Sequence, residues 1–234
     1  MPDTVNSGDP RIISFNTLRK AIGWLGILLP AAMLAGNFLF GKCCCIQDSN
    51  SHYYYTVTGS LFVGILCAVA LFLISYKGYP GDKTDNILTN FAGICAIGIA
   101  VFPTNDNSSG SCAIFHLPDC AARSITHYGC AGLFFLTLAV ISFFLFTKGK
   151  GVPTDRKIIR NRVYRTCGIL IAVFMVLIVV SGICEKHWPQ VGRLKATFWL
   201  EWLALVAFGT SWLIKGELIL KDKPGMTSAG QPSA

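Results

Sequence analysis

The side chains of this chain best suited to chemistry are polar residues at the edges of long apolar stretches. Glu201 lies five residues into the apolar segment 196–214, and His127 directly precedes the segment 128–146. A carboxylate and an imidazole can serve as general base and general acid, and with a metal ion they form hydrolytic zinc centres. A carboxylate that faces hydrocarbon costs several kcal/mol, so we expect Glu201 to face neighbouring helices.

Three further polar residues are predicted at the same depth. His52 and Tyr54 precede the apolar segment 57–76, and Asn105 follows the segment 87–102. We therefore interpret His52, Tyr54, Asn105, His127 and Glu201 as candidate ligand-binding residues. Three alternatives stay open: a structural His–Glu hydrogen bond with an aromatic belt, a cavity that grips a lipid headgroup, and a metal site. No HExxH, HxxxH or CxxC spacing supports the metal site, so we predict no metal and no cofactor.

The elements that must position these residues are long apolar segments. Of the 234 residues, 53% are hydrophobic and 14% charged, and the mean hydropathy is +0.54. A soluble domain is roughly 25% charged, so this composition excludes an ordinary cytosolic enzyme and a disordered protein. A helix needs ~20 apolar residues to cross a bilayer. We predict an all-α, polytopic integral membrane protein with six spans, at 21–40, 57–76, 87–102, 128–146, 167–184 and 196–214.

The distribution of basic residues predicts the topology. If the segments alternate in direction, 15 of the 20 lysines and arginines lie on the side of the two termini and 5 on the other. Cytoplasmic loops carry an excess of Lys and Arg, so both termini are predicted to be cytoplasmic. The predicted organisation is a cytoplasmic segment 1–20, a membrane domain 21–216 and a disordered cytoplasmic tail 217–234. The predicted location is the cell membrane, which is the plasma or inner membrane in a bacterium; the alternative in a eukaryote is an endomembrane.

Six cysteines fall on or near the predicted outer side, where disulfides can form. We expect disulfides among them, for example a local Cys112–Cys120 pair and a bond from the Cys43–Cys45 run to Cys184. Small residues in two spans allow close helix contacts, and the alternative interpretation is that membrane helices merely tolerate glycine. The small residues are Gly93 and Gly98 in the third span, and Gly129 and Gly132 in the fourth.

A basic cluster precedes the fifth span on the predicted cytoplasmic side. Its members Arg156, Lys157, Arg160 and Arg162 are candidate headgroup-binding residues. Such a cluster attracts anionic lipids by ~1 kcal/mol per charge near the surface. The alternative interpretation is a topology determinant without a ligand.

The leading functional hypothesis is a lipid-binding protein, or an accessory to lipid handling, that uses an outer-leaflet polar cavity. One alternative is an intramembrane lipid hydrolase or transferase with Glu201 or Asp106 as general base and His127 as acid or metal ligand. Another is a small-solute transporter or channel. The expected partners are membrane lipids, and a protein partner in the membrane is a further candidate. No nucleic-acid-binding motif occurs, so we predict no nucleic acid partner.

Several short motifs between about residues 20 and 217 are typical of one group of membrane proteins. They are Ser51-His52-Tyr53-Tyr54-Tyr55-Thr56, Leu61-Phe62-Val63-Gly64, Tyr76-Lys77, Asn90-Phe91-Ala92-Gly93, Phe102-Pro103, His127 with Ala131 and Phe134, and Glu201-Trp202 with Phe208-Gly209. In these motifs the chain resembles the DRAM–Frag–Sfk group of six-span membrane proteins and their bacterial relatives of unknown function. The resemblance implies six helices with both ends cytoplasmic. Eukaryotic members are linked to lipid-anchor remodelling, membrane lipid organisation and lysosomal autophagy, so it implies a lipid-related role rather than a particular reaction.

Overall fold

In the computed structural model the described chain is all-helical. The structure describes residues 15–41, 45–77, 83–106, 113–148 and 154–220. The described helices are α1 (Phe15–Phe40), η1 (Asn50–Tyr55), α2 (Gly59–Ser75), α3 (Lys83–Val101), α4 (Ala121–Val140), η2 (Ile141–Leu145), α5 (Asp155–His187), η3 (Pro189–Leu194) and α6 (Ala196–Lys215). η1 and η3 are 3₁₀-helices, and η2 is a π-helical continuation of α4.

Five of these helices are long and apolar enough to cross a membrane: α1, α3, α4 together with η2, α5 and α6. The protein is therefore a multi-pass helical membrane protein. The remaining helix α2 is also apolar but has 17 residues.

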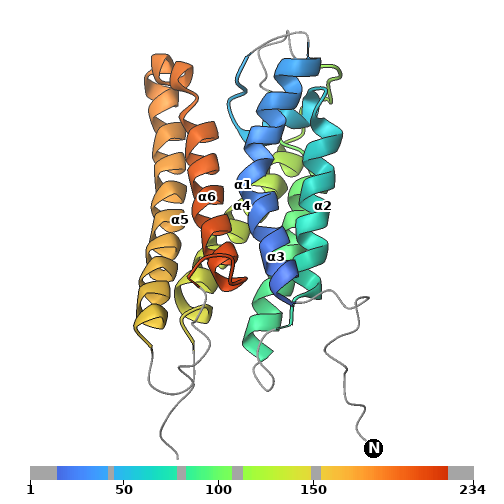
Figure 1. Cartoon of the computed structure of the whole chain (residues 1–234). Helices are drawn as coiled ribbons and strands as arrows, with labels where there is room; N and C mark the ends of the chain where they lie inside the picture. Colours follow the sequence, from blue (N-terminus) through green and yellow to red (C-terminus); the bar gives the residue numbers. More distant parts are fainter. Residues whose placement is uncertain (1–14, 42–44, 78–82, 107–112, 149–153, 221–234) are drawn as a thin grey trace, which may run out of the picture.

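The helices form a closed bundle in which each helix packs against the next along the chain and α6 returns to pack against α1. Successive helices run in opposite directions, so α1 begins and α6 ends at the same end of the bundle (Figure 1). We call that end the lower end. The opposite end, which carries η1 and η3, is the upper end.

Aromatic side chains fill the lower half of the core. The fully buried Trp212 of α6 lies 5.3 Å from Tyr76, 5.2 Å from Phe146 and 5.9 Å from Phe208, measured between ring centroids. Edge-on packing of this kind contributes ~0.5–1.5 kcal/mol per pair beyond the area that it buries. Leu205, Phe208 and Trp212 follow Glu201 at steps of four, three and four residues, and all three are buried. They therefore lie on one face of α6 that packs into the bundle.

The surroundings of the four glycines differ between the two helices that carry them. A Cβ at Gly93 would lie 2.6 Å from Ile74 of α2, and one at Gly98 would meet the side chain of Cys130 in α4. These two glycines do allow close helix contacts, as predicted. Nothing lies within 4 Å of a Cβ at Gly129 or Gly132, because both point into open space. For those two the alternative interpretation applies, in which a membrane helix tolerates glycine without a close contact.

The observed helices are longer than most of the predicted spans. α3 begins at Lys83 and ends at Val101, just before Pro103, which fits the fixed φ of proline and its missing N–H. α5 has 33 residues and starts at Asp155, where Thr154 caps it by accepting a hydrogen bond from the Lys157 amide at 3.2 Å. The basic cluster is therefore the first turns of a continuous membrane helix rather than a loop.

The expected disulfides are not formed in the part of the chain that the structure describes. Cys45, Cys120 and Cys184 are free thiols, which removes both the Cys112–Cys120 pair and the bond to Cys184. Cys120 is the extended N-cap residue that precedes α4, and Cys184 lies within the last turns of α5. Cys43, Cys44 and Cys112 lie outside the described residues.

Candidate functional site

Glu201 faces the interior of the bundle at the upper end, as its cost in hydrocarbon requires. Its Oε2 accepts two hydrogen bonds from Asn50, one from the backbone amide at 2.7 Å and one from Nδ2 at 3.1 Å. Asn50 is the first residue of η1, where the backbone amide has no partner within the helix. The carboxylate of α6 therefore satisfies the free end of η1 and holds that segment against the bundle.

His127 of α4 is 1% exposed and also binds η1. Its Nδ1 lies 2.7 Å from the carbonyl oxygen of Phe102, and its Nε2 lies 2.8 Å from the hydroxyl of Ser51. A carbonyl can only accept, so Nδ1 carries the proton and donates it. In the neutral ring, Nε2 then accepts from the Ser51 hydroxyl. His127 thus links the end of α3, the start of α4 and η1.

Glu201 and His127 are connected through η1 and do not bond to each other. Their partners Asn50 and Ser51 are consecutive residues, so η1 is inserted between α6 and α4. The direct interhelical hydrogen bond that the sequence suggested is replaced by this bridge. Asn50 and Ser51 were missed in the sequence, although polar residues next to a tyrosine run at the predicted depth were a signal that could have pointed to them.

A small cavity lies beside Glu201. Its volume is about 60 Å³, which is the share of roughly two water molecules at ~30 Å³ each. Ligand sites measure ~300–1,000 Å³, so this cavity is smaller than a typical small-molecule site. The binding of a lipid headgroup by these residues stays a prediction. The cavity is lined by Leu29, Asn50, Ser51, Phe62, Leu66, Ile99, Ala131, Phe134, Phe135, Glu201 and Leu205.

His52 is buried in η1 but does not line this cavity. Only 6% of its surface is exposed, and neither ring nitrogen has a hydrogen-bond partner among the described residues. Burial lowers the pKa of His52, and the nearby charges of Asp48 and Asp106 oppose this shift only in part. The folded protein therefore favours the neutral ring.

Tyr54 and Asn105 have other surroundings. The ring of Tyr54 packs edge-on against Tyr55 and Phe115, with centroids 5.3 and 5.8 Å away. The Oδ1 of Asn105 accepts from the Cys120 amide at 3.1 Å and from Arg123 Nη2 at 3.3 Å. The five predicted residues share one end of the bundle, but Glu201 alone lines the cavity.

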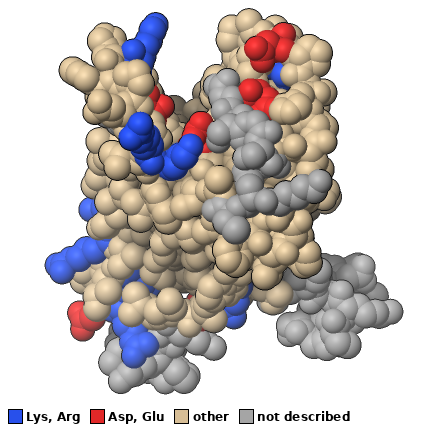
Figure 2. Space-filling view, turned by 90° about the horizontal axis from the view of Figure 1, so that it is seen from above, with Lys and Arg blue, Asp and Glu red and all other residues tan. Residues whose placement is uncertain are grey.

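The described residues contain no group of three or more His, Cys, Asp or Glu side chains placed to hold a metal ion. Asp106, the other candidate general base, pairs with His116, while Asp48 pairs with Lys195. Seen from above, acidic and basic side chains lie close together on this end of the protein (Figure 2).

A larger apolar groove, which we call the upper groove, lies between the upper half of α1 and α6. Its volume is about 550 Å³, and its α6 wall is Trp202, the residue next to Glu201. Trp202 stacks on Trp199 with ring centroids 5.5 Å apart and planes 10° apart. The upper groove is lined by Ala31, Leu34, Ala35, Asn37, Phe38, Leu39, Cys45, Ile46 and Trp202.

The candidate headgroup-binding residues divide into two pairs at the lower end. Lys157 and Arg160 line a second pocket, whereas Arg156 and Arg162 are not in its lining. The charge count along the sequence identified all four residues. It could not separate them, because the direction of each side chain around α5 depends on the packing of that helix.

Comparisons with protein-family models, with curated proteins and with solved structures find no match for this chain.

Proposed function

We propose that this membrane protein has six spans with both chain ends on the cytoplasmic side, and that it binds the acyl chain of an outer-leaflet lipid in the upper groove. The sixth span is α2, whose 17 residues extend ~25 Å at ~1.5 Å per residue. The excess of lysine and arginine at the lower end supports this orientation. The resemblance to the DRAM–Frag–Sfk group implies the same arrangement and a lipid-related role.

The observation that carries the proposal is the size and lining of the upper groove. Its 550 Å³ falls within the ~300–1,000 Å³ of small-molecule sites, and its lining is apolar apart from Asn37. It runs along membrane-spanning helices, next to the exposed side chains of Phe38 (63%) and Leu39 (68%). Water at that depth would gain few hydrogen bonds, so the occupant that matches the lining is a hydrocarbon chain.

The polar residues at the upper end support this groove. Glu201 holds Asn50, and the Phe198 amide donates to the carbonyl oxygen of Asp48 at 3.0 Å. These bonds fix the segment 45–50 against α6. Because Cys45 and Ile46 at the start of that segment form part of the groove wall, the network around Glu201 keeps the groove in shape.

Lipid quantification tests this proposal. Wild type and Ala35→Trp are purified in detergent, and the phospholipids that remain bound are counted by native mass spectrometry. The large ring fills the upper groove, so we expect Ala35→Trp to lose one bound phospholipid per chain. Val176→Trp is the matched control, because Val176 of α5 is 62% exposed and is not in the groove lining.

The proposal is contradicted if Ala35→Trp retains as much lipid as wild type while both melt at the same temperature. Equal loss in Val176→Trp also contradicts it, because that result would indicate lipid held all over the apolar surface rather than in the groove.

A further inference from the structure

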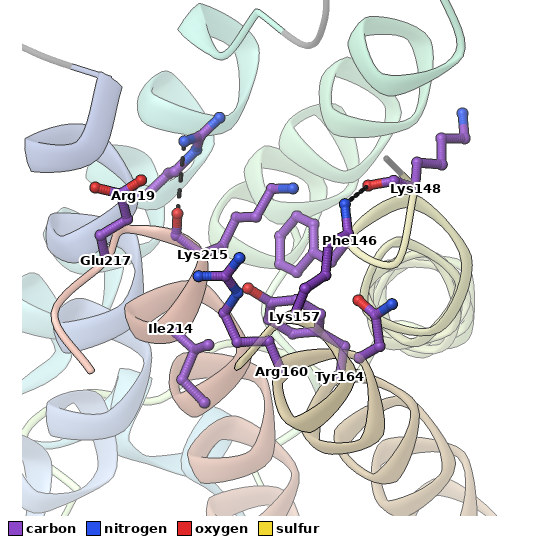
Figure 3. A pocket seen from close by; sticks show the side chains of 10 residues that line it. Arg19, Phe146, Lys148, Lys157, Arg160, Tyr164, Ile214, Lys215 and Glu217 are labelled. Atoms are coloured by element: carbon purple, nitrogen blue, oxygen red, sulfur yellow. Dashed lines mark hydrogen bonds between the residues drawn. The ribbon is translucent and has the colours of Figure 1, made fainter. Parts of the chain in front are cut away.

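A second pocket lies at the lower end of the bundle and brings together cationic side chains that are far apart in the sequence. Its volume is about 110 Å³. Figure 3 shows side chains from α1, α5, α6 and the segment after η2 converging on it. We call it the lower pocket; its lining is Arg19, Phe146, Lys148, Lys157, Arg160, Asn161, Tyr164, Ile214, Lys215 and Glu217.

The lining has a strong excess of positive charge. Five of its ten residues are lysine or arginine, and Glu217 is the one acidic residue in the lining. Lys157 Nζ donates to the carbonyl oxygen of Lys148 at 3.3 Å, and Arg160 Nη1 donates to that of Leu220 at 3.1 Å. These contacts orient the two cations, and a third lining cation, Lys148, pairs with Asp85 at 3.5 Å.

Aromatic rings form one wall and hold the cations in place. Lys215 Nζ lies 5.3 Å from the centroid of the Phe146 ring, which packs edge-on against Tyr164 at 5.4 Å. Arg19 lies over the ring of Tyr76 at 5.4 Å and donates to its hydroxyl at 3.2 Å. Cation–π contacts of this kind stabilise a cation without neutralising it.

Two buried atoms in the lining have unused hydrogen-bonding capacity. The Nε of Arg19 and the Oδ1 of Asn161 have no hydrogen-bond partner within the described part of the chain. Nε needs an acceptor, and Oδ1 needs a donor. An anionic oxygen supplies the acceptor, and a hydroxyl group or a water molecule on the same ligand supplies the donor.

We propose that the lower pocket binds a phosphate group, carried by a phosphomonoester lipid headgroup or free as inorganic phosphate. Arginine forks and lysine ammonium groups are the usual protein partners of phosphate. The pocket volume equals about four water molecules at ~30 Å³ each, which fits one phosphate and excludes a whole lipid. In the proposed topology this end lies at the level of the cytoplasmic-leaflet headgroups. The inference goes beyond lipid binding in the upper groove and does not depend on it.

Three preparations of the full chain distinguish the two sources of phosphate. The protein is placed in phosphatidylcholine nanodiscs, in the same nanodiscs with added inorganic phosphate, and in nanodiscs that contain phosphatidic acid. The melting temperature is followed by tryptophan fluorescence, and affinity is taken from the titrations. A rise with phosphatidic acid alone identifies a lipid headgroup, and a rise with inorganic phosphate identifies the free ion.

Neighbouring arginines on α5 provide the matched variants. Arg160→Gln removes a lining cation, and Arg162→Gln removes an exposed cation that is not in the lining. We expect the affinity for the phosphate probe to fall at least tenfold in Arg160→Gln and to stay within twofold of wild type in Arg162→Gln. Lys157→Gln is the second lining variant if Arg160→Gln does not fold, and the same tenfold loss is expected.

The inference is overturned if neither probe raises the melting temperature of wild type. It is also overturned if Arg162→Gln loses as much affinity as Arg160→Gln or Lys157→Gln, since the binding would then reflect surface charge in general. Failure of this test leaves the lipid count of the Ala35→Trp variant unaffected, so the two proposals fail separately.

Discussion

Removal of the Glu201 carboxylate is the perturbation with the most direct structural consequence. Glu201→Ala deletes the acceptor of two hydrogen bonds, at 2.7 and 3.1 Å, and leaves both Asn50 donors without it. Hydrogen bonds to a charged group contribute about 1.5–3 kcal/mol each. Water in the adjacent cavity of about 60 Å³ can solvate part of Asn50, which offsets some of this loss. We therefore expect the free energy of unfolding to fall by about 2–4 kcal/mol.

The assay is reversible unfolding in mixed micelles with increasing SDS, followed by tryptophan fluorescence. Glu201→Gln keeps an oxygen that can accept both bonds but removes the negative charge. Neutral hydrogen bonds contribute about half as much as bonds to a charged group, so about half of the loss is expected, roughly 1–2 kcal/mol. Glu185→Ala on α5 is the control for removal of a carboxylate that makes no such contact with η1, and we expect a change within about 0.5 kcal/mol. If Glu201→Ala costs no more than Glu185→Ala, the carboxylate does not hold η1 and the reasoning is refuted.

Three further outcomes follow from the structure. Because burial lowers the pKa of His52, the unfolded chain binds more protons than the folded protein below about pH 6.5. The free energy of unfolding should therefore decrease as the pH drops through that region. His52→Leu should make this decrease smaller, as measured by the free energy of unfolding at a series of pH values. Gly93→Ala should lower the melting temperature because its Cβ meets Ile74, whereas Gly129→Ala should raise stability by up to ~1 kcal/mol through helix propensity; equal effects would contradict the packing. A maleimide should label the exposed Cys45 without reductant and leave the buried Cys167 unlabelled until SDS is added; labelling of both at one rate would contradict the bundle.

Much of the helical scaffold was predictable, because a segment that crosses the hydrocarbon core must be a long apolar helix. The apolar segments mark the helices, and Pro103 marks the end of α3. The start of α5 was not predictable in the same way. Its first turns are as basic as a cytoplasmic loop. Thr154 caps them, and Arg160 in these turns donates to the carbonyl oxygen of Leu220 after α6.

The sequence predicted the depth of the candidate site residues along the bundle, but not which neighbours their side chains contact. Glu201 faces inward because hydrocarbon excludes it, and that argument needs no neighbour. Which residue meets Glu201 depends on how the segment after α1 folds back, and no periodicity describes a short 3₁₀-helix. For this reason Asn50 was missed, while Tyr54 was assigned to a cavity that it does not line.

For the lower pocket, too, the sequence predicted the depth of the residues but not which of them meet. The sequence placed Lys157 and Arg160 near lipid headgroups, but Arg19 and Lys215 counted only toward the orientation of the chain. Those two residues are separated by almost the whole protein, and they meet because α6 closes the bundle against α1.

The most direct test of the central claim is a density map of the protein in lipid nanodiscs, inspected at the upper groove. The predicted result is an elongated lipid density between α1 and α6 that contacts Ala35 and Trp202, with Asn50 bonded to Glu201 beside it. A groove closed by the protein's own side chains, with Asn50 withdrawn from Glu201, would contradict the claim.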